Sequence, residues 1–488
     1  MQMTFLGHQS WMLSHDSTNI LIDPLLVNSF GHSDAVEFYV YPPRTVNLDK
    51  MPRLAGMILS HEHLDHFHLP SLIHLSKDVP VYVSTLMLDC VCEAIEQLGL
   101  KIHRITPGKK FQVGSMSLVF YPAAPETVFW EKRVHQIYAY PTADQSQSVF
   151  VAVDALVNKE FKSALNSGKI PPLRSIVCAN NSQVVPDGAH GSHSNLLPIP
   201  DQDTMRNPGV SLLYGILDRY LKGLPPIPDV VLCGNGFYDR NQEFGPFLYS
   251  DNYRLAQIAN ELGFHEKVFG ARPGDTYDLS QIPTAETTAD WVRLETEEQK
   301  QLMEKQAEFV RNPVYSGLRC LLGKFKSDAE YQEALSVLQV ELVELARALM
   351  LSSVGQLSVS INEHLIGDLD SKRILFRFLT DDGSPIQFAL DLNRAEFIED
   401  FTPTSEILKR FPFGVEMHLI DFVGILQGRL QIWDLAGTAM RSWYVGDRYR
   451  NVVAFLFARY GEQARPDLAA KVYSRALARL STASHAAG

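Results

Sequence analysis

Three histidines and one aspartate lie within six consecutive residues, in the segment His61–His66, which reads His-Glu-His-Leu-Asp-His. The segment follows the apolar run Leu54–Leu59, so it begins a loop directly after a predicted buried strand. Zinc and iron bind neutral imidazole nitrogens and carboxylate oxygens at about 2.0–2.2 Å. The alternative is a surface loop rich in histidine by chance, but chance rarely gives this spacing. The predicted metal ligands in this segment are His61, His63, Asp65 and His66.

Composition indicates a large globular protein that acts on a small molecule. The chain has 488 residues, and 45% of them are hydrophobic, which is enough for large cores and for two to four domains. Its formal net charge is −12 and it has no basic stripe, which argues against a nucleic-acid partner. No window of about 18 uninterrupted apolar residues is present, so we expect a cytoplasmic protein without a membrane partner.

The first half of the chain alternates short strand-like runs with turns and helical segments, which is typical of a layered α/β architecture. The run Leu86–Leu98 has the spacing of a helix. The predicted strands are Met3–Gly7, Asn19–Ile22, Pro80–Val83, Phe111–Val113, Ser117–Tyr121, Ser148–Val153 and Asp229–Cys233.

The composition changes after Leu279, and we predict three regions: a catalytic domain over 1–285, a helical linker over 286–326 and a C-terminal α+β domain over 327–488. A capping box at Ser327–Glu330 opens a helix of the third region. Its stripe of leucines favours packing within its own domain over a homodimer seam, because it is short. The leucines are Leu335, Leu338, Leu342, Leu345 and Leu349.

The segment His61–His66, with the opening Phe5–His8 and the run Ile20–Pro24, resembles the metallo-β-lactamase superfamily, in particular its lactonase-like metal hydrolases. The resemblance implies an αββα sandwich followed by a smaller α+β C-terminal domain. It also implies one or two divalent metal ions, which are zinc or, alternatively, iron or manganese. His61 and His63 would hold the first ion, and Asp65 and His66 the second. Glu62, between these ligands, is expected to face solvent.

The family also uses a carboxylate at the end of a later strand, and Asp154 is the match, although an aspartate that starts a turn is the alternative. The histidine that members carry after another strand is missing. Glu126 replaces it in this interpretation, or His135 reaches in. A carboxylate at that position shifts the preference from zinc towards iron or manganese.

The final histidine of the family is also missing from the last core strand, which reads Val-Val-Leu-Cys-Gly-Asn over 230–235. His193, in a loop with His190, is a candidate ligand, or it lines the mouth of the substrate site. Asp23, in the turn after Ile20–Ile22, is expected to support the ligands from behind.

A closer resemblance, over nearly the whole chain, is to CMP-N-acetylneuraminate hydroxylase-like proteins. It rests on the segments Leu59–His66, Leu69–Leu75, Val79–Val83 and Gly270–Leu279. The tail Arg373–Trp443 looks like the C-terminal domain of that group and, less closely, like the sterol-carrier-type domains of some alkyl sulfatases. Those hydroxylases also carry a Rieske domain, which this sequence lacks, so their electron-transfer route is not carried over.

Three functions follow, and metal-assisted hydrolysis is favoured. In this hydrolysis, Asp65 and His66 are the expected catalytic residues, and the substrate is a small molecule that is anionic or carbonyl-bearing. A di-iron oxygenase is the alternative, because Glu126 and the missing final histidine make the ligand set richer in oxygen. A non-catalytic metal-binding module is the third, and the intact segment His61–His66 argues against it.

Overall fold

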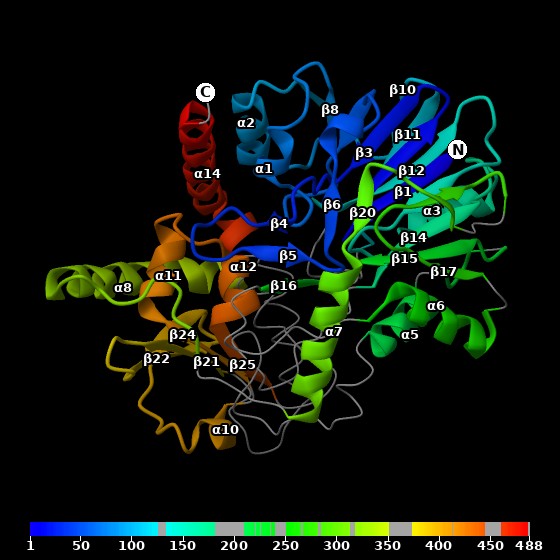
Figure 1. Cartoon of the computed structure of the whole chain (residues 1–488). Coiled ribbons are helices and arrows are strands. Elements are labelled where there is room, and N and C mark those ends of the chain that lie inside the picture. Colours follow the sequence, from blue (N-terminus) through cyan, green and yellow to red (C-terminus); the bar gives the residue numbers. More distant parts are fainter. Residues whose placement is uncertain are drawn as a thin grey trace.

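The computed structural model describes residues 1–124, 133–180, 209–219, 221–224, 226–234, 236–239, 250–264, 267–281, 285–312, 318–350, 373–411, 413–444 and 460–486. Figure 1 shows two large sheets packed together and, apart from them, a smaller sheet built from the C-terminal part of the chain. In these described residues, no helix is long and apolar enough to cross a membrane.

The first large sheet holds eight strands among the described residues, beginning with an antiparallel meander and continuing with parallel strands. In spatial order they are β19 (Ala285–Thr288), β18 (Asp275–Asp278), β1 (Gln2–Gly7), β2 (Ser10–His15), β3 (Thr18–Ile22), β7 (Gly56–Ile58), β8 (Val81–Ser84) and β9 (Ile102–Ile105).

The second large sheet holds seven strands of the described chain, antiparallel at its beginning and parallel from β13 onward. In spatial order they are β10 (Lys110–Val113), β11 (Met116–Pro122), β12 (His135–Pro141), β13 (Val149–Val151), β14 (Ser175–Asn180), β15 (Asp229–Gly234) and β17 (Val268–Gly270).

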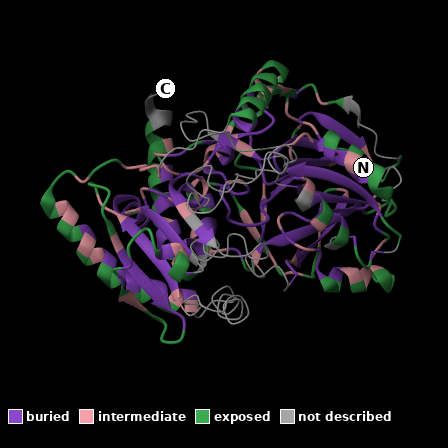
Figure 2. Ribbon diagram, turned by 90° about the horizontal axis from the view of Figure 1, so that it is seen from below, coloured by how far each residue is buried: buried purple, intermediate pink, exposed green. Residues whose placement is uncertain are grey.

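The two sheets pack face to face because alternate residues of their strands are apolar on the inner side. Phe5 and Leu13 of the first sheet share one buried core with Phe120 and Val151 of the second. Both sheets are buried in Figure 2.

The outer faces are covered by helices. The first sheet is covered by α1 (Leu69–Leu72), α2 (Asp89–Gln97) and α14 (Pro466–Ala486). The second is covered by α3 (Lys159–Asn166), α5 (Val210–Arg219) and α6 (Asn252–Ala259). The layers therefore run helix, sheet, sheet, helix, which confirms the predicted αββα sandwich.

In its described residues, the C-terminal region has a five-stranded sheet with helices on it, in the order β23 (Glu396–Glu399), β22 (Pro385–Asp391), β21 (Arg373–Leu379), β24 (Phe413–His418) and β25 (Met440–Tyr444). Its helices are α8 (Asp328–Met350), α10 (Ile407–Arg410), α11 (Leu419–Leu426) and α12 (Ile432–Asp434). The leucines of α8 pack into this region's own core, as predicted.

Shorter elements connect the two parts. The helix α7 (Thr296–Arg311) precedes α8, and the predicted limits of the three regions stay predictions. The last helix, α14, leaves the C-terminal region and packs beside α2 on the sandwich (Figure 1). The described part of the chain also holds two small sheets: β16 (Phe237–Asp239), β5 (Phe38–Val40) and β4 (Ser29–Phe30), then β20 (Val292–Leu294) and β6 (Arg44–Val46).

Candidate metal centre

The segment His61–His66 lies in a loop at the carboxyl end of β7, between two parallel neighbours, β3 and β8. Asp23 directly follows β3, and Asp154 comes three residues after the end of β13 in the other sheet. Loops at the carboxyl ends of parallel strands are where α/β proteins place their ligand sites, because the strands deliver several loops to one edge. Side chains far apart in the sequence therefore meet here.

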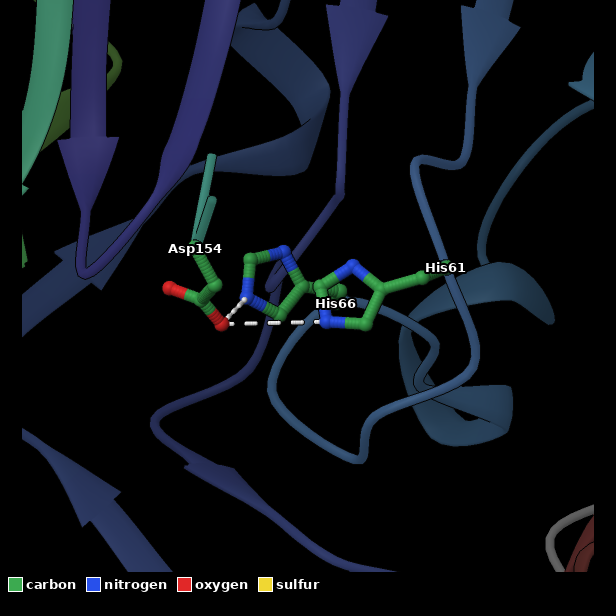
Figure 3. Close-up of side chains that lie close together, drawn as sticks. All are labelled: His61, His66 and Asp154. Carbon is green, nitrogen blue, oxygen red and sulfur yellow. Dashed lines mark hydrogen bonds and ion pairs between the residues drawn. The ribbon is translucent and has the colours of Figure 1, made fainter. Parts of the chain in front are cut away.

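Three side chains form a tight group (Figure 3). The ligand atoms of His61, His66 and Asp154 all lie within 4.8 Å of one another. Asp154 Oδ2 is 3.1 Å from His66 Nε2 and 3.7 Å from His61 Nε2. Both histidines are buried, whereas the Asp154 side chain keeps 12% of its exposure. The group is open to solvent on its carboxylate side.

Asp23 and Ser60 fix the orientation of both imidazoles. Asp23 Oδ2 is 2.7 Å from His66 Nδ1 and accepts a hydrogen bond of 2.6 Å from Ser60 Oγ. Since the Ser60 hydroxyl donates its proton to Asp23, it accepts from His61 Nδ1, 2.8 Å away. Both histidines thus carry a proton on Nδ1, and the Nε2 atom of each faces Asp154. Asp23 lies behind the histidines, as the sequence predicts.

His63 and Asp65 lie at opposite ends of this group. His63 Nδ1 is 2.8 Å from His61 Nε2. Asp65 Oδ2 is 3.5 Å from His66 Nε2. The pairing of His61 with His63, and of His66 with Asp65, matches the division predicted for two ions. That these residues bind metal stays a prediction.

Two further residues contact the site without having been assigned a role from the sequence. His8 Nε2 lies 2.7 Å from Asp65 Oδ2, and its Nδ1 lies 3.1 Å from the carbonyl oxygen of Gly234. Gln9 Nε2 donates to Asp154 Oδ1. Both residues follow Gly7 in the turn between β1 and β2. The signal that could have found them is a polar pair in a tight turn directly after a buried strand.

Backbone strain concentrates around the group. In the described part of the chain, five residues other than glycine have a positive φ. Three of them flank the site: His8 at 53°, Asp23 at 45° and Val153 at 54°. A β-branched residue such as Val153 rarely adopts this conformation. Strain of this kind persists where the surroundings hold a functional geometry in place.

Two expectations about neighbouring residues are wrong. Glu62 does not face solvent: it is 3% exposed and pairs with the guanidinium of Arg133, because the C-terminal region packs over this loop. His135 does not reach the group. Its position on β12 turns Nε2 to Ser84 Oγ, 2.9 Å away, and burial lowers its pKa to about 4. Glu126, His190 and His193 lie outside the described residues.

The charges of the group suit a bound cation. Burial lowers the pKa of His61, and the neighbouring His66 and His63 lower it further, so His61 stays neutral. Burial alone would raise the pKa values of Asp65 and Asp154, but His66 together with hydrogen bonds from His8 to Asp65 and from Gln9 to Asp154 lowers both. Burial also disfavours a charged His66, yet the adjacent carboxylates raise its pKa well above its ordinary value. Metals require neutral imidazole and ionised carboxylate. His61, Asp65 and Asp154 are in these forms, whereas His66 has to release its Nε2 proton when an ion binds.

The hydrogen-bond pattern also indicates a place for a cation. The lone pair on His61 Nε2 faces a carboxylate oxygen of Asp154 and a second imidazole nitrogen, His63 Nδ1. His61 Nε2 and the Asp154 oxygen both accept hydrogen bonds, so they repel each other when buried unless a cation lies between them, whereas His63 Nδ1 can donate to His61 Nε2 when it carries a proton. Two imidazoles and a carboxylate make a donor set that zinc, iron and manganese all accept. The residues present therefore fit a divalent metal.

A family profile described as a beta-lactamase superfamily domain matches residues 18–154. This stretch runs from β3 to Asp154 and contains the three clustered residues. A UPF0173 protein of Pyrococcus abyssi is 24% identical over 131 residues, which are 26% of this chain and 52% of that protein. The chain thus spans about half the length of this curated relative. Both matches support the predicted superfamily, while its lactonase-like and hydroxylase-like branches stay predictions.

Solved structures with similarity to this chain include three with low scores. An isothiocyanate hydrolase from Delia radicum gut bacteria has a TM-score of 0.36 and 16% identity, covering 57% of this chain and 99% of its own. A possible metal-dependent hydrolase from Veillonella parvula has a TM-score of 0.38 and 12% identity, and the match covers 57% of this chain and 98% of that one. CmlA, a diiron β-hydroxylase from Streptomyces venezuelae, has a TM-score of 0.35 and 14% identity, and the match covers 56% of this chain and 53% of that one. These TM-scores are too low to support a function.

Proposed function

We propose that this protein is a metal-dependent hydrolase of a small molecule that is anionic or carbonyl-bearing. The observation that carries the proposal is the convergence of His61 Nε2, His66 Nε2 and Asp154 Oδ2, all within 4.8 Å, at the edge of an αββα sandwich. A divalent ion bound there lowers the pKa of a water molecule to about 7 and polarises a carbonyl or phosphoryl oxygen.

The protein's own groups would position the attacking water. Asp65 keeps 16% of its side-chain exposure, so it lies on the open side of the site with Asp154. The His8 imidazole, 2.7 Å away, holds the Asp65 carboxylate in place. Asp65 is therefore placed to orient the attacking water as a hydrogen-bond acceptor, and the buried histidines exclude solvent from the opposite side. A substrate would approach from the side of the two carboxylates, so an anionic substrate depends on a bound cation to offset their charge, whereas a carbonyl-bearing substrate does not.

The test is hydrolysis by full-length protein freed of metal by a chelator and then loaded with zinc, manganese or ferrous ion. The substrates are a panel of lactones, carboxylic esters, amides and phosphodiesters. We expect hydrolysis of one class by the loaded protein only, and loss of that activity in Asp65→Asn even where the ion on the His61 side is retained. A loaded protein inert on the whole panel would contradict the proposal.

A di-iron oxygenase is the second candidate, and one observation favours it. Two carboxylate oxygens, from Asp65 and Asp154, lie within 3.5 Å of His66 Nε2, so this side of the site is rich in oxygen. Such a set suits iron or manganese better than zinc. Protein purified without chelator that contains iron, and that consumes oxygen when substrate is added, would favour this candidate over the hydrolase.

A further inference from the structure

The side of the centre that holds His63 is closed by residues from the far end of the chain. The π-helical turn η5 (Tyr460–Ala464) precedes α14, and α14 packs on the sandwich beside α1 and α2. This packing carries the side chain of Glu462 to the loop His61–His66. Glu462 is 8% exposed, so its carboxylate is buried at the contact between the two parts of the molecule.

Glu462 contacts both His63 and a tryptophan of the C-terminal region. Its Oε2 lies 3.4 Å from His63 Nε2, and its Oε1 accepts a 2.7 Å hydrogen bond from Trp433 Nε1. The Trp433 ring packs edge-on against the His63 imidazole, with 5.1 Å between the ring centroids. The Trp433 indole thus holds one oxygen of the Glu462 carboxylate, and the other oxygen faces the His63 imidazole.

Arg133 adds a second charged contact at the same place. Its guanidinium pairs with Glu62 and lies 3.9 Å from Glu462 Oε2. Glu62 and Glu462 come from opposite ends of the chain, so the cation between them ties the loop to the C-terminal turn. Buried carboxylates need such partners, because an unpaired charge away from water is strongly unfavourable.

We propose that Glu462 is a positioning residue of the metal centre: it holds His63 with the proton on Nε2, so that the Nδ1 lone pair faces the same space as His61 Nε2. The two nitrogens lie 2.8 Å apart. A carboxylate behind a metal-binding histidine fixes its ring and raises its basicity, and loss of such a partner weakens metal binding by about 10–100-fold. The inference rests on the proposed metal-dependent function, and it makes the C-terminal region part of the centre.

The competing explanation is that Glu462 only fastens the C-terminal region to the sandwich. Removal of a fastening contact lowers the free energy of unfolding but leaves the metal affinity of the folded protein unchanged. Removal of a positioning contact changes the affinity and the ligand geometry. Metal affinity and the absorption spectrum of bound Co²⁺ therefore separate the two explanations.

The experiment uses full-length protein and Co²⁺, titrated against a competing chelator. We expect Glu462→Ala to raise the Kd of one Co²⁺ site by about 10–100-fold and to alter its visible absorption. Glu462→Gln should lose less, because its amide oxygen still accepts from His63 Nε2. If the alanine variant does not fold, the test uses Glu462→Gln and Trp433→Phe. Each of these variants is expected to weaken Co²⁺ binding measurably.

The matched control is Glu341→Gln, which removes an ion pair to Arg465, three residues beyond Glu462, without touching His63. It should bind Co²⁺ within about twofold of wild type. Wild-type affinity and spectrum in the Glu462 variants would overturn this inference and leave the proposed function standing. A wild-type protein that binds no metal would instead refute the proposed function, and the inference with it.

Discussion

The two sides of the metal centre are supported by different parts of the chain. His66 is oriented by Asp23, which follows the strand next to its own in the first sheet. His63 is contacted by Glu462, which reaches the loop only because α14 packs back on the sandwich. The first support is built into the sandwich, whereas the second depends on the docking of the C-terminal region. The difference makes the two sides separable by mutation.

The largest expected effect is on the side built into the sandwich. In His66→Ala the group loses the imidazole that faces both Asp65 and Asp154. We expect loss of the ion on this side and at least about a 10³-fold loss of hydrolysis, measured by elemental analysis and by rate. The control is His74→Ala, at an exposed histidine outside the group. Full metal content and rate in His66→Ala would show that this side is not the site.

The next effect compares the two supports directly. Asp23 orients His66 by contact and His61 through Ser60, whereas Glu462 contacts one histidine only. Asp23→Asn should therefore weaken metal binding at least as much as Glu462→Ala, by about 10–100-fold. Calorimetric titration with Zn²⁺ measures both. An Asp23→Asn variant that binds more tightly than Glu462→Ala would reverse the proposed order of the two supports.

A last effect, on stability and not on metal binding, concerns a buried carboxylate outside the metal centre. Burial raises the pKa of Asp434, in the C-terminal region, to about 7, in contrast to the lowered pKa values of Asp65 and Asp154. Between pH 4 and 7 the folded chain keeps a proton that the unfolded chain, with a pKa near 3.9, releases. The free energy of unfolding should fall by about 1.4 kcal/mol per pH unit as the pH rises through this window.

Asp434→Asn removes this contribution. Urea unfolding from pH 4.5 to 7.5 should show the variant gaining stability relative to wild type as the pH rises, by roughly 3 kcal/mol. Other titrating groups cancel in the difference between the two proteins. A difference that is the same at both ends of the range would mean that Asp434 is ionised throughout.

Features that depend on local pattern could be predicted from the sequence. Alternating apolar residues predicted the strands, and the sheets that these strands form pack in layers as expected. The segment His61–His66 lies in a loop after a buried strand, and Asp154 lies beside it although it comes from the other sheet. These features follow from strand ends, which a sequence marks by a polar residue after an apolar run.

Features that depend on packing between distant segments could not be predicted. Glu62 is buried because the C-terminal region covers its loop, and nothing in the local sequence indicates this. Glu462 lies in a polar stretch that resembles an ordinary solvated turn. His135 turns to Ser84 because strand pairing sets the direction of its side chain. In each case the decisive partner is remote in sequence.

The most direct test of the central claim is the metal content of the full-length protein purified without chelator and after incubation with zinc, manganese or ferrous ion. The predicted result is one to two ions per chain, reduced in both His66→Ala and Asp154→Asn. Protein that stays free of metal under all of these conditions would contradict the account.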